Sequence, residues 1–205
     1  MVGASRASSS PLAPSPSTNQ IIELAARHDI ELYSQGNLDC LCGVYAAINA
    51  LRLGLHDHDP LTKAEAKRLL ERGTAYLDRK QALAEALVNG METRRWHALV
   101  RHLAKQAATD SMLIELERPE FHPKPTIADI FGWIDTSLAE GKPVLVQLSN
   151  GLDHFSVVAG ATSASLQLFD SDGHRFVRRA SCGIKTGFHH IPPKALMRLS
   201  VRRRR

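Results

Sequence analysis

The chain has little cysteine, few aromatic residues and no long hydrophobic run. It holds three cysteines in 205 residues, and aromatic side chains make up only 5%. An odd, low cysteine count argues against a disulfide framework and favours a reducing compartment. Because no apolar run approaches about 18 residues, we expect no membrane span. The length and the 43% of hydrophobic residues suit one domain with an aliphatic core.

The net charge of +5 is concentrated at the C-terminus. Residues 198–205 hold five arginines, and without them the chain has 21 basic and 21 acidic residues. We therefore interpret 198–205 as a solvated basic tail that follows a domain over residues 19–197. An acidic partner, a nucleic acid or a membrane headgroup layer that binds this tail is the alternative.

Residues 1–18 are rich in Ser, Ala and Pro and have no acidic residue. They lack the hydrophobic stretch of a Sec signal and predict a disordered leader. We expect a cytoplasmic protein, with a secreted effector that is exported without a Sec signal as the alternative.

The apolar spacing predicts helices first and an antiparallel sheet after them, which is the α+β class. Thr62 with Glu65, and Thr126 with Asp129, are expected to cap helices. The expected helices cover 19–28, 42–53, 62–71 (ending at Gly73), 75–88, 93–107 and 126–141. The expected strands cover 112–116, 143–148, 154–161, 165–170 and 175–179.

Cys42 lies where a polar loop, residues 33–39, meets an apolar helix. Cysteine nucleophiles act as thiolates, which a helix N-terminus and a nearby imidazolium favour. Gly43 allows a close backbone approach at this point. We expect the Cys42 N–H to be one oxyanion donor and the side-chain amide of Gln35 to be the second.

His154 opens an expected strand, and Asp170 ends the next one. A strand, a turn and a returning strand of these lengths would bring the two residues side by side. His154 would then be the base for Cys42, and Asp170 would fix its tautomer. Asp172 is the alternative acid, although its place before Gly173 indicates a turn, and Asp153 adjoins the base.

Each of these residues also has an ordinary interpretation, as core filler, polar strand end or turn former. Cys40 and Cys42 form a C-x-C pair, but a zinc site would need two more ligands, and the run from His56 to Asp59 is typical of a solvated turn. We therefore expect no metal and no cofactor. Trp96 and Trp133 are expected in the core or lining a cleft.

Three segments, QGNLDCLCGVYAAINAL, DHFSVVAG and LQLFDSDG, together resemble papain-like cysteine peptidases. They are closest in style to the C39-like peptidases, which process bacteriocin leaders, and echo the Asp-Cys-Gly-aromatic motif of ubiquitin-like-protein proteases. The resemblance covers about residues 33–55 and 143–173. It implies a papain-like fold and a thiol hydrolase in which Gln35, Cys42, His154 and Asp170 have the roles given above.

The chain departs from this pattern in the distance between the glutamine and the cysteine. The gap is usually about six in this group, whereas here it is seven to Cys42 and five to Cys40. We favour Cys42 as the nucleophile, with Cys40 as the alternative. The expected activity is cleavage of an amide bond in a peptide or protein through an acyl-enzyme. The alternatives are an acyltransferase or transglutaminase-like enzyme with the same triad, and a non-catalytic interaction module on a papain fold.

Overall fold

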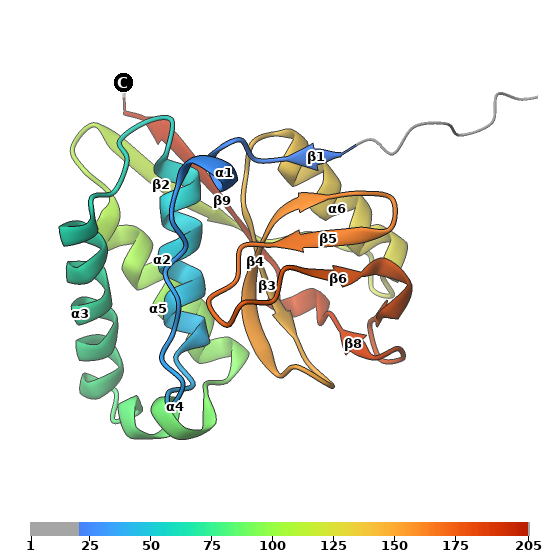
Figure 1. The fold of residues 1–205 in the computed structure, drawn as a ribbon, viewed down its shortest axis with the longest axis horizontal. Helices are drawn as coiled ribbons and strands as arrows, with labels where there is room; N and C mark the ends of the chain where they lie inside the picture. Colours follow the sequence, from blue (N-terminus) through green and yellow to red (C-terminus); the bar gives the residue numbers. More distant parts are fainter. Residues whose placement is uncertain (1–20, 205) are drawn as a thin grey trace, which may run out of the picture.

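Most of the helices lie on one side of an antiparallel sheet, as Figure 1 shows. The structure is a computed structural model that describes residues 21–204. Its helices are α1 (Ala26–Asp29), α2 (Cys42–Leu55), α3 (Lys63–Arg79), α4 (Leu83–Asn89), α5 (Thr93–Ala107) and α6 (Ile127–Ala139), with 3-10 turns η1 (Arg179–Ser181) and η2 (Pro193–Ala195). Its strands are β1 (Ile22–Glu23), β2 (Met112–Glu117), β3 (Val144–Leu148), β4 (His154–Ala161), β5 (Ser165–Leu168), β6 (Phe176–Arg178), β7 (Cys182–Gly183), β8 (His189–His190) and β9 (Met197–Arg203).

The main sheet has the strand order β2-β9-β3-β4-β5-β6, and all of these neighbours are antiparallel. β1 pairs with Gly160 and Ala161 at the C-terminal end of β4, beyond Val158, the last residue of β4 that pairs with β3. This arrangement confirms the expected mixture of helices and an antiparallel sheet. β4 is buried along its whole length, so it is the central strand on which both helical layers pack.

Helix α2 is the central helix of the first layer. Eleven of its fourteen residues are buried, and it contacts β4, α5, α3 and β9. Alanines at 46, 47 and 50 keep its surface slim, which allows the backbone of α2 to approach the sheet closely. On the other side of β4, α6 packs with Ile130, Ile134 and Leu138 buried.

Two helix boundaries differ from the sequence prediction. α3 continues through Gly73, because that glycine faces Val44 on α2 and a Cβ there would lie 3.2 Å from Val44 Cγ1. Gly73 therefore permits packing between helices and does not end one. The helix expected over 75–88 is divided between the end of α3 and α4, with Gln81 at a positive φ of 52° in between.

The first expected helix, 19–28, is also wrong in its described part. Residues 22–23 form β1, and only the single turn α1 is helical. Edge pairing with Gly160 and Ala161 outweighs local helix propensity here. The expected leader, 1–18, lies outside the described residues.

Residues 198–203 of the expected C-terminal tail belong to strand β9, so the predicted domain boundary at residue 197 is wrong. β9 lies between β2 and β3, with Met197 and Leu199 buried. Arg198 Nε donates to Glu117 Oε2 at 2.9 Å, and its Nη1 donates to Glu140 Oε2 at 3.1 Å. Apolar residues at 197, 199 and 201 alternate with Arg198, Ser200 and Arg202. The partners of these three are glutamates of β2 and, for Arg198, also Glu140 after α6. Counting charges alone hides that period of two.

Within residues 21–204, none of the helices combines the length and apolar character that a membrane-spanning segment needs.

Candidate active site

Cys42 is the first residue of α2 and is buried. The loop before it is held by Asp39, whose carboxylate accepts the backbone N–H of Gly36 at 2.8 Å and that of Leu41 at 3.1 Å. The backbone N–H of Cys42 donates no hydrogen bond to any of residues 21–204. The first turn of α2 therefore presents a thiol and an unpaired N–H donor at the same point.

Gly43 fixes the start of α2 against the sheet. Trp96 Nε1 donates to the carbonyl oxygen of Gly43 at 2.9 Å, and the Trp96 and Phe155 rings lie 4.1 Å apart. A Cβ at Gly43 would lie 2.9 Å from Trp96 Cδ1 and 3.2 Å from Phe155 Cδ2. Because Phe155 follows His154 on β4, this packing sets the position of Cys42 relative to the imidazole. Trp96, expected only in the core or at a cleft, is thus a positioning residue.

His154 is the first residue of β4, and its Nε2 lies 2.7 Å from Asp170 Oδ2. Both side chains are almost fully buried, at 6% and 0% exposure. The other carboxylate oxygen of Asp170 accepts the backbone N–H of Asp172 at 2.9 Å and that of His174 at 3.2 Å. Asp170 is therefore held in one orientation by the turn that follows it.

The Cys42 thiol interacts with the His154 ring, since hydrogen bonding with Cys42 is among the causes that raise the pKa of His154. Asp170 occupies Nε2, so Nδ1 is the ring nitrogen that is left for the thiol. Sulfur, imidazole and carboxylate thus form one chain of contacts between the head of α2 and the ends of β4 and β5.

The charged forms of His154 and Asp170 stabilise each other. Burial alone would lower the pKa of His154, but the hydrogen bond with Asp170 and the contact with Cys42 outweigh it and raise the pKa to about 10. Burial acts to raise the pKa of Asp170, yet the bond to His154 holds it below its usual value. The imidazolium and carboxylate forms are therefore favoured at neutral pH.

Gln35 lies beside the same turn. Its backbone N–H donates to the Ser171 carbonyl oxygen at 3.0 Å, and the Ser171 hydroxyl donates to Gln35 Oε1 at 3.4 Å. Its amide NH₂ has no acceptor among residues 21–204. Ser171 follows Asp170, so the loop before Cys42 and the turn that holds Asp170 are tied together at Gln35.

The alternatives to Cys42 and Asp170 lie in different surroundings. Cys40 is exposed and its Sγ donates to the Val88 carbonyl oxygen at 3.2 Å, at the end of α4. Asp172 lies 3.6 Å from His174 Nε2, and Asp153 accepts the N–H of Asn150 at 3.2 Å in the loop before β4. Of the candidate nucleophiles and acids, Cys42 and Asp170 are the ones that interact with His154.

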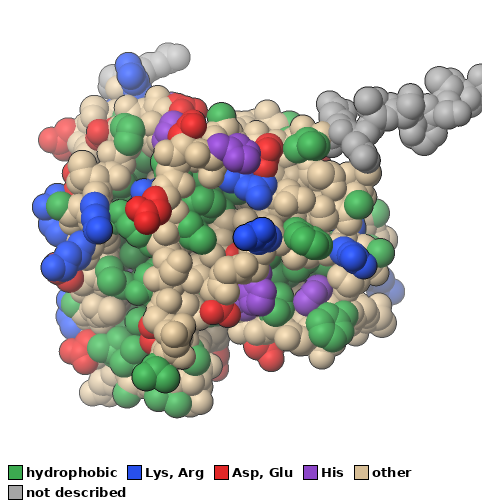
Figure 2. All heavy atoms as spheres, viewed as in Figure 1, with side chains coloured by type: hydrophobic (Ala, Val, Ile, Leu, Met, Phe, Trp, Pro, Cys, Tyr) green, Lys and Arg blue, Asp and Glu red, His purple; other side chains and the backbone are tan. Residues whose placement is uncertain are grey.

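A second histidine borders the site. The His174 ring meets the His154 ring edge-on, with centroids 5.5 Å apart, and is partly exposed. On the face seen in Figure 2, histidine side chains lie beside hydrophobic ones over the half of the molecule that carries the sheet, and others lie near the top, toward the helical half. Sequence spacing gave no sign of this contact, because His174 follows a turn whose path is set by Asp170.

Among residues 21–204, no three His, Cys, Asp or Glu side chains come together as a group that could hold a metal ion. His56 Nδ1 instead contacts its neighbour Asp57 at 2.7 Å. A scan against protein-family models finds no match to the chain, and a search of curated proteins finds no significant match. The chemistry of the site is therefore argued from its own residues.

Proposed function

We propose that this chain is a cysteine peptidase on a papain-like fold, with Cys42 as its nucleophile. One observation carries the proposal: the Cys42 thiol at the head of a buried helix interacts with His154, and Nε2 of His154 is bonded to the buried Asp170. Nucleophile, base and orienting acid in this sequence of contacts are the parts that acyl transfer from an amide requires.

In the first half of the reaction, the Cys42 sulfur attacks the carbonyl carbon of the substrate. The thiol gives its proton to His154, whose raised pKa favours the imidazolium form. His154 then gives the proton to the amide nitrogen as the C–N bond breaks, which releases the amine and leaves a thioester on Cys42.

The tetrahedral oxyanion needs donors that point to the place where its charge develops. The unpaired N–H of Cys42 is one such donor, and the free NH₂ of Gln35 is the second. The Ser171 hydroxyl, by holding Oε1 of Gln35, leaves the donor end of that amide available.

In the second half, water attacks the thioester while His154 takes one of its protons. The C–S bond breaks, the product leaves as a carboxylic acid, and the thiol of Cys42 is restored with its partner imidazole. Asp170 keeps the ring in the tautomer that both halves need.

Exposed hydrophobic side chains near the site support a polypeptide substrate. Leu38 is 99% exposed in the loop before Cys42, and Val88 is 71% exposed beside Cys40. Phe188, 64% exposed, lies against Gly151 in the loop that leads to His154. Apolar groups on both sides of a nucleophile suit the flanking side chains of a peptide.

The proposal is tested by incubating the full chain with a complex peptide mixture and identifying new chain ends by mass spectrometry. We expect new ends with the wild-type chain and with Cys40→Ala, and none with Cys42→Ala. Cleavage by Cys42→Ala, or a loss caused only by Cys40→Ala, would overturn the assignment.

The same assay separates the rival activities. Adding a primary amine distinguishes hydrolysis from acyl transfer, since a transferase would give amide products in place of free acids. If folded wild-type chain gives neither product and both cysteines react equally slowly with a vinyl sulfone, the interaction module is favoured.

A further inference from the structure

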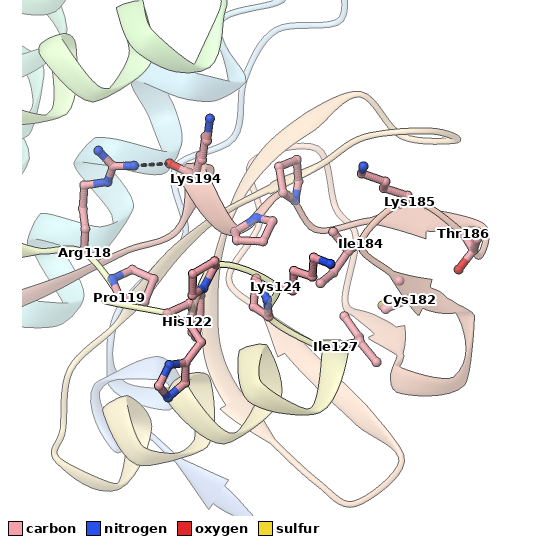
Figure 3. A pocket seen from close by; sticks show the side chains of 16 residues that line it. Arg118, Pro119, His122, Lys124, Ile127, Cys182, Ile184, Lys185, Thr186 and Lys194 are labelled. Carbon is pink, nitrogen blue, oxygen red and sulfur yellow. Dashed lines mark hydrogen bonds between the residues drawn. The ribbon is translucent and has the colours of Figure 1, made fainter.

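A hollow of the surface lies outside the Cys42–His154–Asp170 cluster. It encloses about 990 Å³ between the β2–α6 connection, the segment after β7 and the η2 turn. Figure 3 shows this groove from close by. We call it the basic groove, and its lining has four cationic residues and no acidic one: Arg118, Lys124, Lys185 and Lys194.

The lysines of the basic groove have no internal counter-charge. Within residues 21–204, Lys142 alone among lysines forms an ion pair. Arg118 donates to the backbone carbonyl oxygen of Lys194 at 2.9 Å, the bond drawn in Figure 3. Lys124, Lys185 and Lys194 are therefore exposed residues at the groove whose positive charges are not neutralised by an ion pair among residues 21–204, which favours an anionic ligand.

The walls of the groove are rigid and partly apolar. Five of the ten prolines of the chain line it, and proline fixes its own backbone φ. Phe121, Ile127 and Ile184 add apolar surface between the charges. A preformed groove of alternating apolar and cationic groups matches an extended segment with both carboxylates and aliphatic side chains.

One segment joins the basic groove to the candidate active site. Residues 182–186 line the groove, and residues 187–190 border the loop before His154. The Asn150 amide donates to the Gly187 carbonyl oxygen at 3.3 Å, and Ser149 and His190 exchange backbone hydrogen bonds at 2.9 and 2.7 Å. A polypeptide bound across Cys42 could therefore continue over Phe188 into the groove.

We propose that the basic groove binds an acidic, extended polypeptide segment of the substrate, away from the bond that is cut. A peptide is favoured over a nucleic acid because Phe121 and His122 are the only lining residues with aromatic rings, and binding a single strand needs a series of aromatic platforms. The identification of this segment with the substrate rests on the proposed function, whereas the binding itself does not.

The binding test uses a fluorescein-labelled peptide of alternating Glu and Leu, followed by fluorescence anisotropy on full-length chain with Cys42→Ala to prevent cleavage. We expect saturable binding that weakens with salt. Lys124→Gln/Lys185→Gln/Lys194→Gln should weaken it about tenfold, since each exposed ion pair contributes a factor of about two.

Two controls of similar chemistry make the result specific. Lys67→Gln/Lys80→Gln/Lys105→Gln removes the same charge from exposed positions on α3, its C-terminus and α5, and should leave binding unchanged. Arg203→Gln/Arg204→Gln tests the end of β9, the basic site that the sequence alone suggested. Equal losses in the three variants, a loss only in the β9 variant, or no binding by the parent would overturn the proposal.

A labelled oligodeoxythymidine of equal charge distinguishes the two polyanions. We expect it to bind more weakly than the peptide, and tighter binding through the same lysines would overturn the peptide assignment. A chain that binds the peptide but cleaves nothing would refute the peptidase and keep the groove. A chain that cleaves peptides without this binding would do the reverse.

Discussion

The buried cluster and the basic groove treat charge in opposite ways. In the cluster, His154 and Asp170 are almost fully buried and bonded to each other, and the remaining carboxylate oxygen is held by two backbone N–H groups. In the groove, three lysines have no acidic partner among the described residues. The first arrangement holds a few groups in one geometry, which suits bond making, and the second leaves charge open to a ligand.

This difference sets the expected size of mutational effects. When one member of a buried ion pair is removed, the charge of the other member is left buried without a partner, which is strongly destabilising. Exposed lysines act through weak contacts that are screened by salt. Substitutions should therefore have large effects in the cluster and small ones in the groove.

The largest effect is expected for His154→Ala. Removing the base should lower kcat/KM by about 10²–10⁴-fold, because proton transfer in both halves of the reaction is lost. The measurement is the rate of cleavage of a peptide identified in the mixture assay. His174→Ala is the matched control, since its ring touches His154 only edge-on, and it should cost far less. Equal losses in the two variants would contradict the assignment.

Asp170→Asn should destabilise the fold by about 3 kcal/mol near pH 6, because His154 loses its ionic partner in a buried place. The pKa of His154 is raised from 6.5 to about 10, so its contribution is complete below about pH 6.5 and is lost as the pH rises through about 10. The gap between wild type and variant should therefore shrink from pH 6 to pH 10.

Denaturant unfolding at several pH values measures this gap. The alkaline limb of kcat/KM against pH should also move to lower pH in Asp170→Asn, since that limb reports loss of the imidazolium proton. A stability difference that is the same at pH 6 and pH 10 would argue against the pairing.

Gly43→Ala should destabilise the protein by about 1–3 kcal/mol through overpacking against Trp96 and Phe155. Gly132→Ala on α6 is the control, because nothing lies within 4 Å of its added Cβ and alanine favours a helix by up to about 1 kcal/mol. Thermal unfolding of the two variants should shift in opposite directions. A stabilising Gly43→Ala would show that the head of α2 is less tightly packed than described.

The smallest effect is expected for a single groove lysine. Lys185→Gln should weaken binding of the acidic peptide about twofold, as one exposed ion pair among several. Lys105→Gln, on the exposed face of α5, should have no effect in the same anisotropy titration. A tenfold loss from Lys185 alone would indicate one localised anion site in place of a distributed surface.

Local patterns were sufficient for much of the fold. The strand 154–161 is confirmed with the same bounds, and both capping boxes, at Thr62 and Thr126, are present because their bonds span only three residues. The sequence did not predict strand β9 or the continuation of α3 beyond Gly73. They depend on glutamates of β2 and on Val44 of α2, which are distant in sequence.

The site shows the same division. The joint order of Gln35, Cys42, His154 and Asp170 predicts that these residues lie near one another. In the structure His154 is bonded to Asp170, and Gln35 is bonded to Ser171, the residue after Asp170. Trp96 and His174 could not be found in this way, since their places depend on packing against Gly43 and on the turn after Asp170.

The central claim is that the Cys42 sulfur is paired with a histidine held by Asp170, and alkylation tests it most directly. The folded chain is treated with limiting iodoacetamide at pH 6, and the label on each cysteine is quantified by mass spectrometry. The account predicts label mainly on Cys42. His154→Ala should lose most of that label, and His174→Ala should keep it unchanged. Label spread equally over Cys40, Cys42 and Cys182, or unchanged by His154→Ala, would contradict it.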